Sequence, residues 1–357
     1  MRLGFPDVAP AIIKRASLKE TAPARMKSDE ASLAWRTLNL NWLPIALLSA
    51  ALLSAIAYSD FSLEPTGFGV LIAIAVSLAT IAYAYAHIRQ SSADPKLVFW
   101  FGVTAQIILL TAIAGPLSYV ANAMNWPLQD QRLLWIDRAI GFDPQQIAAF
   151  FNDHSWIVRY LSVAYGFIKW PLLGVPIILA MGSRFFRLQQ FVLTLSVALA
   201  VTIIVSAFVP AVGTYYGLGL SPSEQFPRIE STNYAAQLRD IFALRDGSLR
   251  QLDVLRLAGI VSFPSFHTAS AVLYVWALWP IRALRPASIA LNAWMVAATP
   301  LIGAHYIIDL IGGAGVAAGS IVVVKYFFRS VLVDPQGRTE PPVYWESAMP
   351  NAGCASE

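Results

Sequence analysis

Two of the four histidines in the chain stand in segments that could carry out covalent catalysis. His267 lies in FPSFHTASA, and His305 lies in GAHYIIDLIGG, where Asp309 follows four residues later. Residues four positions apart lie on one face of an α-helix, so we expect Asp309 to accept a hydrogen bond from the ring of His305. Such a carboxylate fixes the tautomer of the imidazole and leaves the far nitrogen free to attack as a nucleophile.

We expect the two histidines to lie at the same depth. They are 38 residues apart, which matches one helix, a tight turn at Arg282–Pro286 and a second helix that runs back. A buried ion pair without chemistry is the plain alternative. Two histidines and a carboxylate can also bind iron, but the sequence has no further cluster of ligands, and we expect no metal and no cofactor.

The composition indicates a membrane protein. Of the 357 residues 57% are hydrophobic and 13% are charged, a balance that does not suit a core surrounded by water. The net charge is +4. We assign it to the basic loops on one side of the membrane described below, so we expect no nucleic-acid partner. The single cysteine, Cys354, excludes an internal disulfide.

Apolar runs long enough to cross a bilayer predict an all-α polytopic membrane protein with about eight transmembrane helices. The expected spans are Trp42–Ser59, Gly67–Ala86, Leu97–Ala123, Tyr160–Met181, Phe191–Thr214, Phe266–Ile281, Ala287–Ala304 and His305–Val324. In the last span Gly312, Gly315 and Gly319 recur at intervals that predict close helix contact.

These spans divide the chain into four parts. Residues 1–41 form a polar tail, 42–96 hold two N-terminal transmembrane helices, 97–330 form a six-helix catalytic core, and 331–357 form a second tail. The core contains two long loops at 125–156 and 215–261. Hydrophobic residues recur at helical spacing in LLWIDRAIGFD of the first loop, which predicts a short helix in the plane of the interface.

The charges of the short loops predict the orientation. Arg89, Lys96, Arg184 and Arg187 stand in two short loops at one face, whereas the segment 60–67 has acids and no Lys or Arg. The positive-inside rule makes the basic face cytoplasmic. Both tails are then cytoplasmic, and the two long loops and both histidines face the non-cytoplasmic side.

The two histidine segments resemble a known family. FPSFHTASA and AHYIIDLIGGA are similar to the second and third motifs of the type 2 phosphatidic acid phosphatase superfamily, and most similar to its inositol phosphorylceramide synthase (aureobasidin-resistance) branch. The resemblance covers about residues 97–330 and implies a six-helix phosphatase-like core.

The resemblance also implies roles for individual residues. His305 is expected to attack phosphorus and form a phosphohistidine, Asp309 to orient it, and His267 to protonate the leaving oxygen. Ser265 and neighbouring backbone N–H groups are expected to bind phosphate oxygens. This mechanism is independent of metal.

The chain departs from the family pattern at the cationic residues. The first motif, KxxxxxxRP, is missing, because the only Arg-Pro pair is Arg285–Pro286 in a turn expected to be cytoplasmic. The cation that binds phosphate is therefore unassigned by the motifs. Arg256 and Arg250, in the outer loop before His267, are the candidates nearest in sequence, since a guanidinium matches phosphate geometry.

Three functions follow as expectations. The branch implies a phosphotransferase that moves a phosphorylated headgroup onto an acceptor lipid, and the superfamily at large implies a lipid phosphate phosphatase. A transporter or proton pathway that uses the His–Asp pair is the alternative of another class, although no internal repeat supports it. Membrane lipids are the expected partners in the two enzymatic cases.

Overall fold

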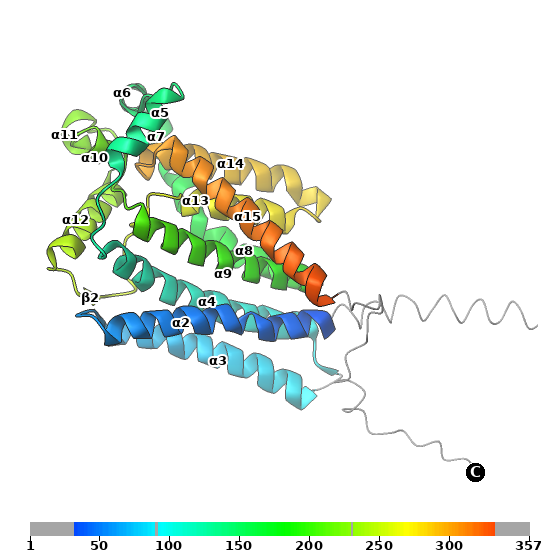
Figure 1. Ribbon diagram of the computed structural model, residues 1–357. Helices are drawn as coiled ribbons and strands as arrows, with labels where there is room; N and C mark the ends of the chain where they lie inside the picture. Colours follow the sequence, from blue (N-terminus) through cyan, green and yellow to red (C-terminus); the bar gives the residue numbers. More distant parts are fainter. Residues whose placement is uncertain (1–31, 90–91, 230, 333–357) are drawn as a thin grey trace, which may run out of the picture.

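The computed structural model describes residues 32–89, 92–229 and 231–332, and nearly all of its regular structure is helical (Figure 1). Cys354 and most of both expected tails lie outside the described residues. The membrane-directed helices are α2 (Trp42–Ala57), α3 (Pro65–Arg89), α4 (Pro95–Asn122), α7 (Ser155–Tyr165), α8 (Lys169–Met181), α9 (Phe185–Phe208), α13 (Phe266–Leu278), α14 (Arg285–Ile302) and α15 (Ile307–Leu332).

Six segments of the described chain are long and apolar enough to cross a membrane. They are Ser32–Ala57, Pro65–Arg89, Pro95–Asn122, Ser155–Met181, Phe185–Phe208 and Ile307–Arg329. The fourth consists of α7 and α8, joined by a short 3-10 turn at Gly166–Ile168. These helices make the chain an integral membrane protein.

The predicted count of eight spans is not confirmed, because the two helices around Arg282 do not meet the same criteria. The first, α13, has 13 residues and at 1.5 Å per residue is about 20 Å long, against a hydrocarbon core of about 30 Å. The second, α14, has 18 residues but begins with Arg285 and includes Asn292, so it is less apolar than the six long segments. The structure thus supports six spans and a shorter hairpin.

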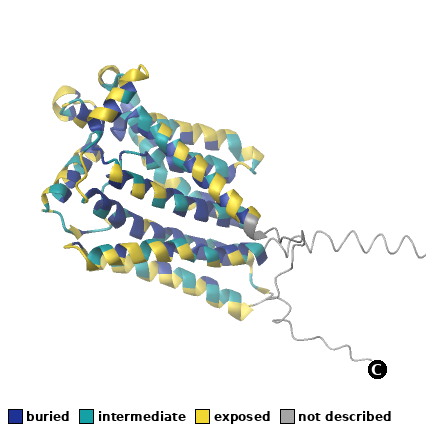
Figure 2. Cartoon of the chain, viewed as in Figure 1, coloured by how far each residue is buried: buried dark blue, intermediate teal, exposed yellow. Residues whose placement is uncertain are grey.

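Two helices occupy the middle of the bundle. Buried side chains concentrate on α4 and α9, and exposed ones dominate α2 and α3 (Figure 2). The helix α4 packs against α2, α3 and α9, whereas α13 packs against α9, α14 and α15. The two histidine segments therefore belong to the half of the bundle that lies across α9 from α2 and α3 (Figure 1).

Short elements gather at one end of the bundle, where α5, α6 and α10 to α12 lie (Figure 1). Their bounds are α5 (Asp130–Ala139), α6 (Pro144–Asp153), α10 (Thr214–Gly217), α11 (Pro222–Gln225) and α12 (Thr232–Asp246). The helix expected in LLWIDRAIGFD is present as α5, and α6 is an additional one. A two-residue parallel pairing joins β1 (Ser62–Leu63) to β2 (Gln251–Leu252).

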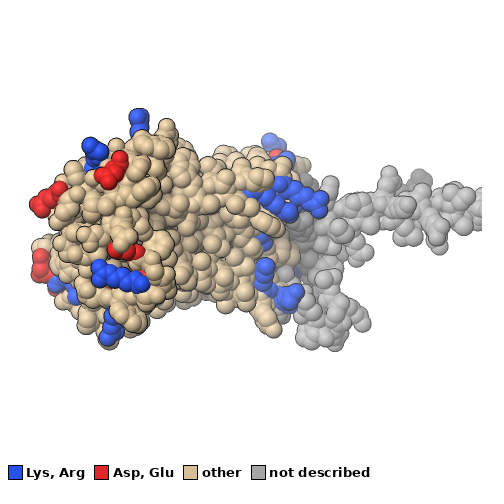
Figure 3. Space-filling view, turned by 90° about the horizontal axis from the view of Figure 1, so that it is seen from above, with Lys and Arg blue, Asp and Glu red and all other residues tan. Residues whose placement is uncertain are grey.

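The charged side chains lie toward the two ends of the bundle. On the face shown in Figure 3, a band without Lys, Arg, Asp or Glu separates them, and the acidic side chains are mostly at the end opposite the grey trace. An uncharged band of this kind suits contact with hydrocarbon.

Candidate active site

The loop between α14 and α15 carries His305. The structure begins α15 at Ile307, two residues after His305, so the expected span His305–Val324 starts too early. The backbone turns sharply at Ala304, whose φ is +52°. The predicted pair is nevertheless formed, with 3.2 Å between Nδ1 of His305 and Oδ2 of Asp309, and both side chains are buried.

Asp309 accepts hydrogen bonds from several groups around His305. Its Oδ2 also accepts hydrogen bonds from the hydroxyl of Ser262 at 2.7 Å and from the N–H of Tyr306 at 3.0 Å. Its backbone carbonyl accepts from the N–H of Ser265 at 2.9 Å. These contacts fix the carboxylate that orients His305, and they join the start of α15 to the segment that precedes α13.

The structure brings the second histidine to the same place. The rings of His267 and His305 have centroids 6.2 Å apart and are inclined at 63°. The other neighbour of His267 is Tyr165, the last residue of α7, whose ring stacks on the imidazole at 4.1 Å. Two imidazoles at this separation can act from opposite sides of one reacting atom.

The predicted phosphate ligand Ser265 lies beside Asp309. Ser265 is fully buried and caps α13, with its hydroxyl facing the N–H and hydroxyl of Thr268 at 3.4 Å. Its own N–H is bonded to Asp309. The hydroxyl of Ser265 is the acceptor in both contacts and keeps its own proton to donate, so its role in binding phosphate stays a prediction.

The two candidate arginines lie at the turn between α2 and α3. The guanidinium of Arg250 donates to the carbonyls of Leu244 and Leu249 and covers the ring of Phe61 at 4.7 Å. Arg256 pairs with Asp253 and is 88% exposed. In the described part of the chain neither arginine contacts His267 or His305, so the structure leaves the phosphate-binding cation unassigned.

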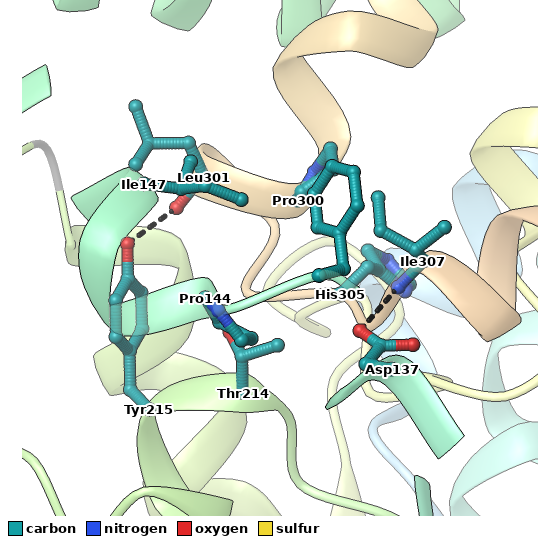
Figure 4. A pocket seen from close by; sticks show the side chains of 10 residues that line it. Asp137, Pro144, Ile147, Thr214, Tyr215, Pro300, Leu301, His305 and Ile307 are labelled. Atoms are coloured by element: carbon teal, nitrogen blue, oxygen red, sulfur yellow. Dashed lines mark hydrogen bonds between the residues drawn. The ribbon is translucent and has the colours of Figure 1, made fainter. Parts of the chain in front are cut away.

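A small cavity lies beside His305 (Figure 4). Its volume is about 10 Å³, which is room for about one water molecule. Side chains from α5, α6, α10 and α14 face it, and the lining is mostly apolar: Asp137, Phe142, Pro144, Ile147, Thr214, Tyr215, Pro300, Leu301, His305 and Ile307. Asp137 is the one carboxylate of this lining.

Two buried aspartates of α5 contact the same region. Asp137 accepts from the N–H groups of Ile307 and Ile308, and Asp130 accepts from the hydroxyl of Tyr306. Burial raises the pKa of both carboxyls above the usual aspartate range, while the N–H donors act in the opposite direction. The sequence interpretation used only the apolar residues of this helix. An acid within a hydrophobic pattern was the signal that could have identified Asp137, whereas Asp130 stands between two glutamines and carried no such signal.

The donor arrangement does not favour the iron alternative. Within residues 32–89, 92–229 and 231–332, no group of three or more His, Cys, Asp or Glu is arranged to hold a metal ion. Nδ1 of His305 faces Oδ2 of Asp309 at 3.2 Å, which is the contact expected of an imidazole oriented by a carboxylate.

Comparison with known proteins gives one match. The PAP2 superfamily model matches residues 131–323, more than half of the chain, and this range includes both histidines and Asp309. Neither the curated proteins nor the solved structures give a match.

Proposed function

Because the chain belongs to the PAP2 superfamily, which acts on lipid phosphates by phosphatase or phosphotransfer chemistry, we propose that it is a headgroup phosphotransferase of the inositol phosphorylceramide synthase type. The observation that carries the proposal is the buried pair of His305 and Asp309 at 3.2 Å, with the ring of His267 at 6.2 Å. This is a nucleophile with its orienting group and an acid–base partner.

The proposed reaction has two halves. In the first, Nε2 of His305 attacks phosphorus, the bond from phosphorus to the ester oxygen breaks, and His267 gives its proton to the leaving oxygen. In the second, His267 takes the proton of an acceptor hydroxyl, whose oxygen attacks phosphorus while the bond to His305 breaks. The Nδ1–H of His305 donates to the carboxylate of Asp309 throughout, and this carboxylate stabilises the charged ring.

The apolar lining of the cavity, with Phe142, Ile147 and Leu301, suits contact with a lipid acceptor, as the inositol phosphorylceramide synthase branch requires. Its volume of about 10 Å³ leaves room for about one water molecule, so the cavity alone does not separate transfer from hydrolysis. Similarity to FPSxH and HYxxDLxGG supports the same branch. Hydrolysis by a lipid phosphate phosphatase of the same superfamily is the outcome that the acceptor experiment distinguishes.

The first prediction is that His305→Ala abolishes turnover. Removal of a covalent nucleophile lowers kcat by about 10³-fold or more, and the variant should retain its insertion and its melting temperature in detergent. The assay offers purified protein phosphatidylinositol or phosphatidic acid, each labelled in the phosphate, with and without ceramide. His154→Ala is the matched control, because His154 is exposed and, among the described residues, its ring bonds only to the carbonyl of Phe150.

Each possible result has a defined meaning. Label that moves to ceramide supports transfer, and label released as a water-soluble phosphate even when ceramide is present indicates a phosphatase. An acid-labile label on the wild-type protein that is lost in His305→Ala supports the phosphohistidine. Full activity of His305→Ala would contradict the covalent mechanism, and a wild type inert toward all donors would leave the transporter alternative in place.

A second prediction concerns metal. Turnover should persist in excess EDTA and be inhibited by vanadate, which mimics the five-coordinate phosphorus of the transition state. His267, His305 and Asp309 are assigned here to proton transfer, attack and orientation, and none of these steps needs a Lewis acid. Loss of activity in EDTA that is restored by Fe²⁺ or Mg²⁺ would instead favour the metal-site alternative.

A further inference from the structure

The loop between α14 and α15, which carries His305, is held by hydrogen bonds from residues distant in sequence. The carbonyl of Ala304 accepts from the N–H of Thr214 at 2.7 Å. The hydroxyl of Tyr306 donates to the carbonyl of Gly213 at 2.9 Å and contacts Asp130 at 3.0 Å. Both chain neighbours of His305 are therefore fixed by residues about 90 or more positions away in sequence.

This conformation is strained and needs those contacts. Ala304 has a φ of +52°, a left-handed value that is strained for a residue with a Cβ. Gly213 opposite it has a φ of +134°, and a Cβ there would lie 2.5 Å from the carbonyl oxygen of Ala304. A backbone held in such a state persists only where its surroundings determine it.

Asp137 adds two contacts that hold the start of α15. Its two carboxylate oxygens accept the N–H groups of Ile307 at 2.8 Å and Ile308 at 3.0 Å, and its side chain is fully buried. The first N–H groups of a helix have no partner within the helix, and they are usually capped by a residue just before it. Here the cap comes from α5, 170 residues earlier.

We propose that Asp137 is a positioning residue that sets the direction of the His305 ring by fixing the start of α15. Nδ1 of His305 is bonded to Asp309, which sits in the first turn of α15. A displacement of this turn therefore moves the orienting carboxylate and the nucleophile together. A misplacement of about 1 Å at a reacting group can cost about 10²-fold in rate. The inference rests on the proposed role of His305.

A different role for Asp137 makes the opposite prediction. The N–H groups at a helix start also bind phosphate, and Asp137 faces the cavity beside His305. If its carboxylate only occupied the position of a phosphate group, its removal would free that position. Substrate and vanadate would then bind more tightly to the variant, and the rate of the chemical step would not fall.

The test compares Asp137→Asn and Asp137→Ala with Asp94→Asn. Asp94 is an exposed aspartate that caps α4, at the opposite end of the bundle, through the N–H of Lys96. It is a matched control for the loss of a capping carboxylate. Single-turnover phosphorylation of the full-length protein is measured with whichever labelled donor, phosphatidylinositol or phosphatidic acid, the wild type consumes.

The amplitude of this reaction reports the fraction of folded protein, and its rate constant reports the positioning of the nucleophile. We expect Asp137→Asn, which keeps one acceptor oxygen, to lower the rate constant about tenfold and Asp137→Ala to lower it about 10²-fold, with KM within about twofold of the wild type. The rate constant of Asp94→Asn should match that of the wild type.

Two results would overturn the inference. One is a loss of amplitude with an unchanged rate constant, which would assign Asp137 to folding alone. The other is tighter vanadate inhibition with an unchanged rate constant, which would assign it to the phosphate position. Failure of the proposed function gives a different result. If His305→Ala still formed a phosphoenzyme, His305 would not be the nucleophile, whereas the contact of Asp137 with α15 would be unaffected.

Discussion

At the scale of single residues, the site depends on how the two oxygens of Asp309 are used. Oδ2 receives the ring of His305, the hydroxyl of Ser262 and the N–H of Tyr306, whereas Oδ1 is buried without a hydrogen bond among the described residues. The pair of His305 and Asp309 was predictable because a four-residue spacing is local. The contact of Ser262 was not, because it joins residues 47 positions apart and depends on how α13 meets α15.

We therefore predict that Ser262→Ala slows the reaction without removing the nucleophile. A hydrogen bond to a charged group contributes about 1.5–3 kcal/mol, so kcat should fall by about tenfold or more while the phosphohistidine still forms. Ser196→Ala is the matched control, since Ser196 is equally buried but donates only to Val192 in its own helix. Equal kcat values for the two variants would show that Ser262 does not assist Asp309.

At the scale of helices, the glycines of α15 set the distance to α13. The sequence pattern predicted close contact at Gly312, Gly315 and Gly319. In the structure a Cβ at Gly312 would lie 2.9 Å from the ring of Phe263, in the segment before α13, and the other two glycines face open space. The closest approach is at Gly313, where a Cβ would overlap the carbonyl oxygen of Ser265. Regular spacing indicated a face of the helix, but the position of the partner helix decides which glycines are needed.

Gly313→Ala and Gly315→Ala should accordingly behave differently. The first forces α15 away from the backbone of α13, and overpacking of this kind costs about 1–3 kcal/mol or more, so the melting temperature in detergent and the activity should both fall. The second adds a methyl group to open space in the same helix, where alanine is a better helix former than glycine by about 1 kcal/mol. Its stability should be unchanged or higher. Equal melting temperatures would show that the close contact at Gly313 does not limit the stability of the protein.

At the scale of the whole molecule, the side on which the site lies depends on whether the number of spans before His305 is odd or even, and not on the number itself. The eight spans expected from sequence include α13 and α14, and the six long helices do not. Two helices joined by a short turn either both cross the membrane or neither does, so the chain ends the hairpin on the side where it began. His305 at the start of α15 therefore lies on the same side in each case. Short apolar helices such as α13 could not be assigned from sequence, because their hydropathy resembles that of a span and only their length differs.

The sidedness itself is our last prediction, and it decides which leaflet supplies the substrate. Arg89, Lys96 and Arg184 stand at the loops that join α3 to α4 and α8 to α9, and the positive-inside rule makes these loops cytoplasmic. The site would then open to the non-cytoplasmic side. In a Cys354→Ser background, single cysteines at the exposed positions Ser223, between α10 and α12, and Ser183, between α8 and α9, test this directly. An impermeant thiol reagent added to intact cells should label the first and reach the second only after the membrane is opened. Labelling of the second alone in intact cells would place both histidines on the cytoplasmic side, and the substrate would have to come from that leaflet.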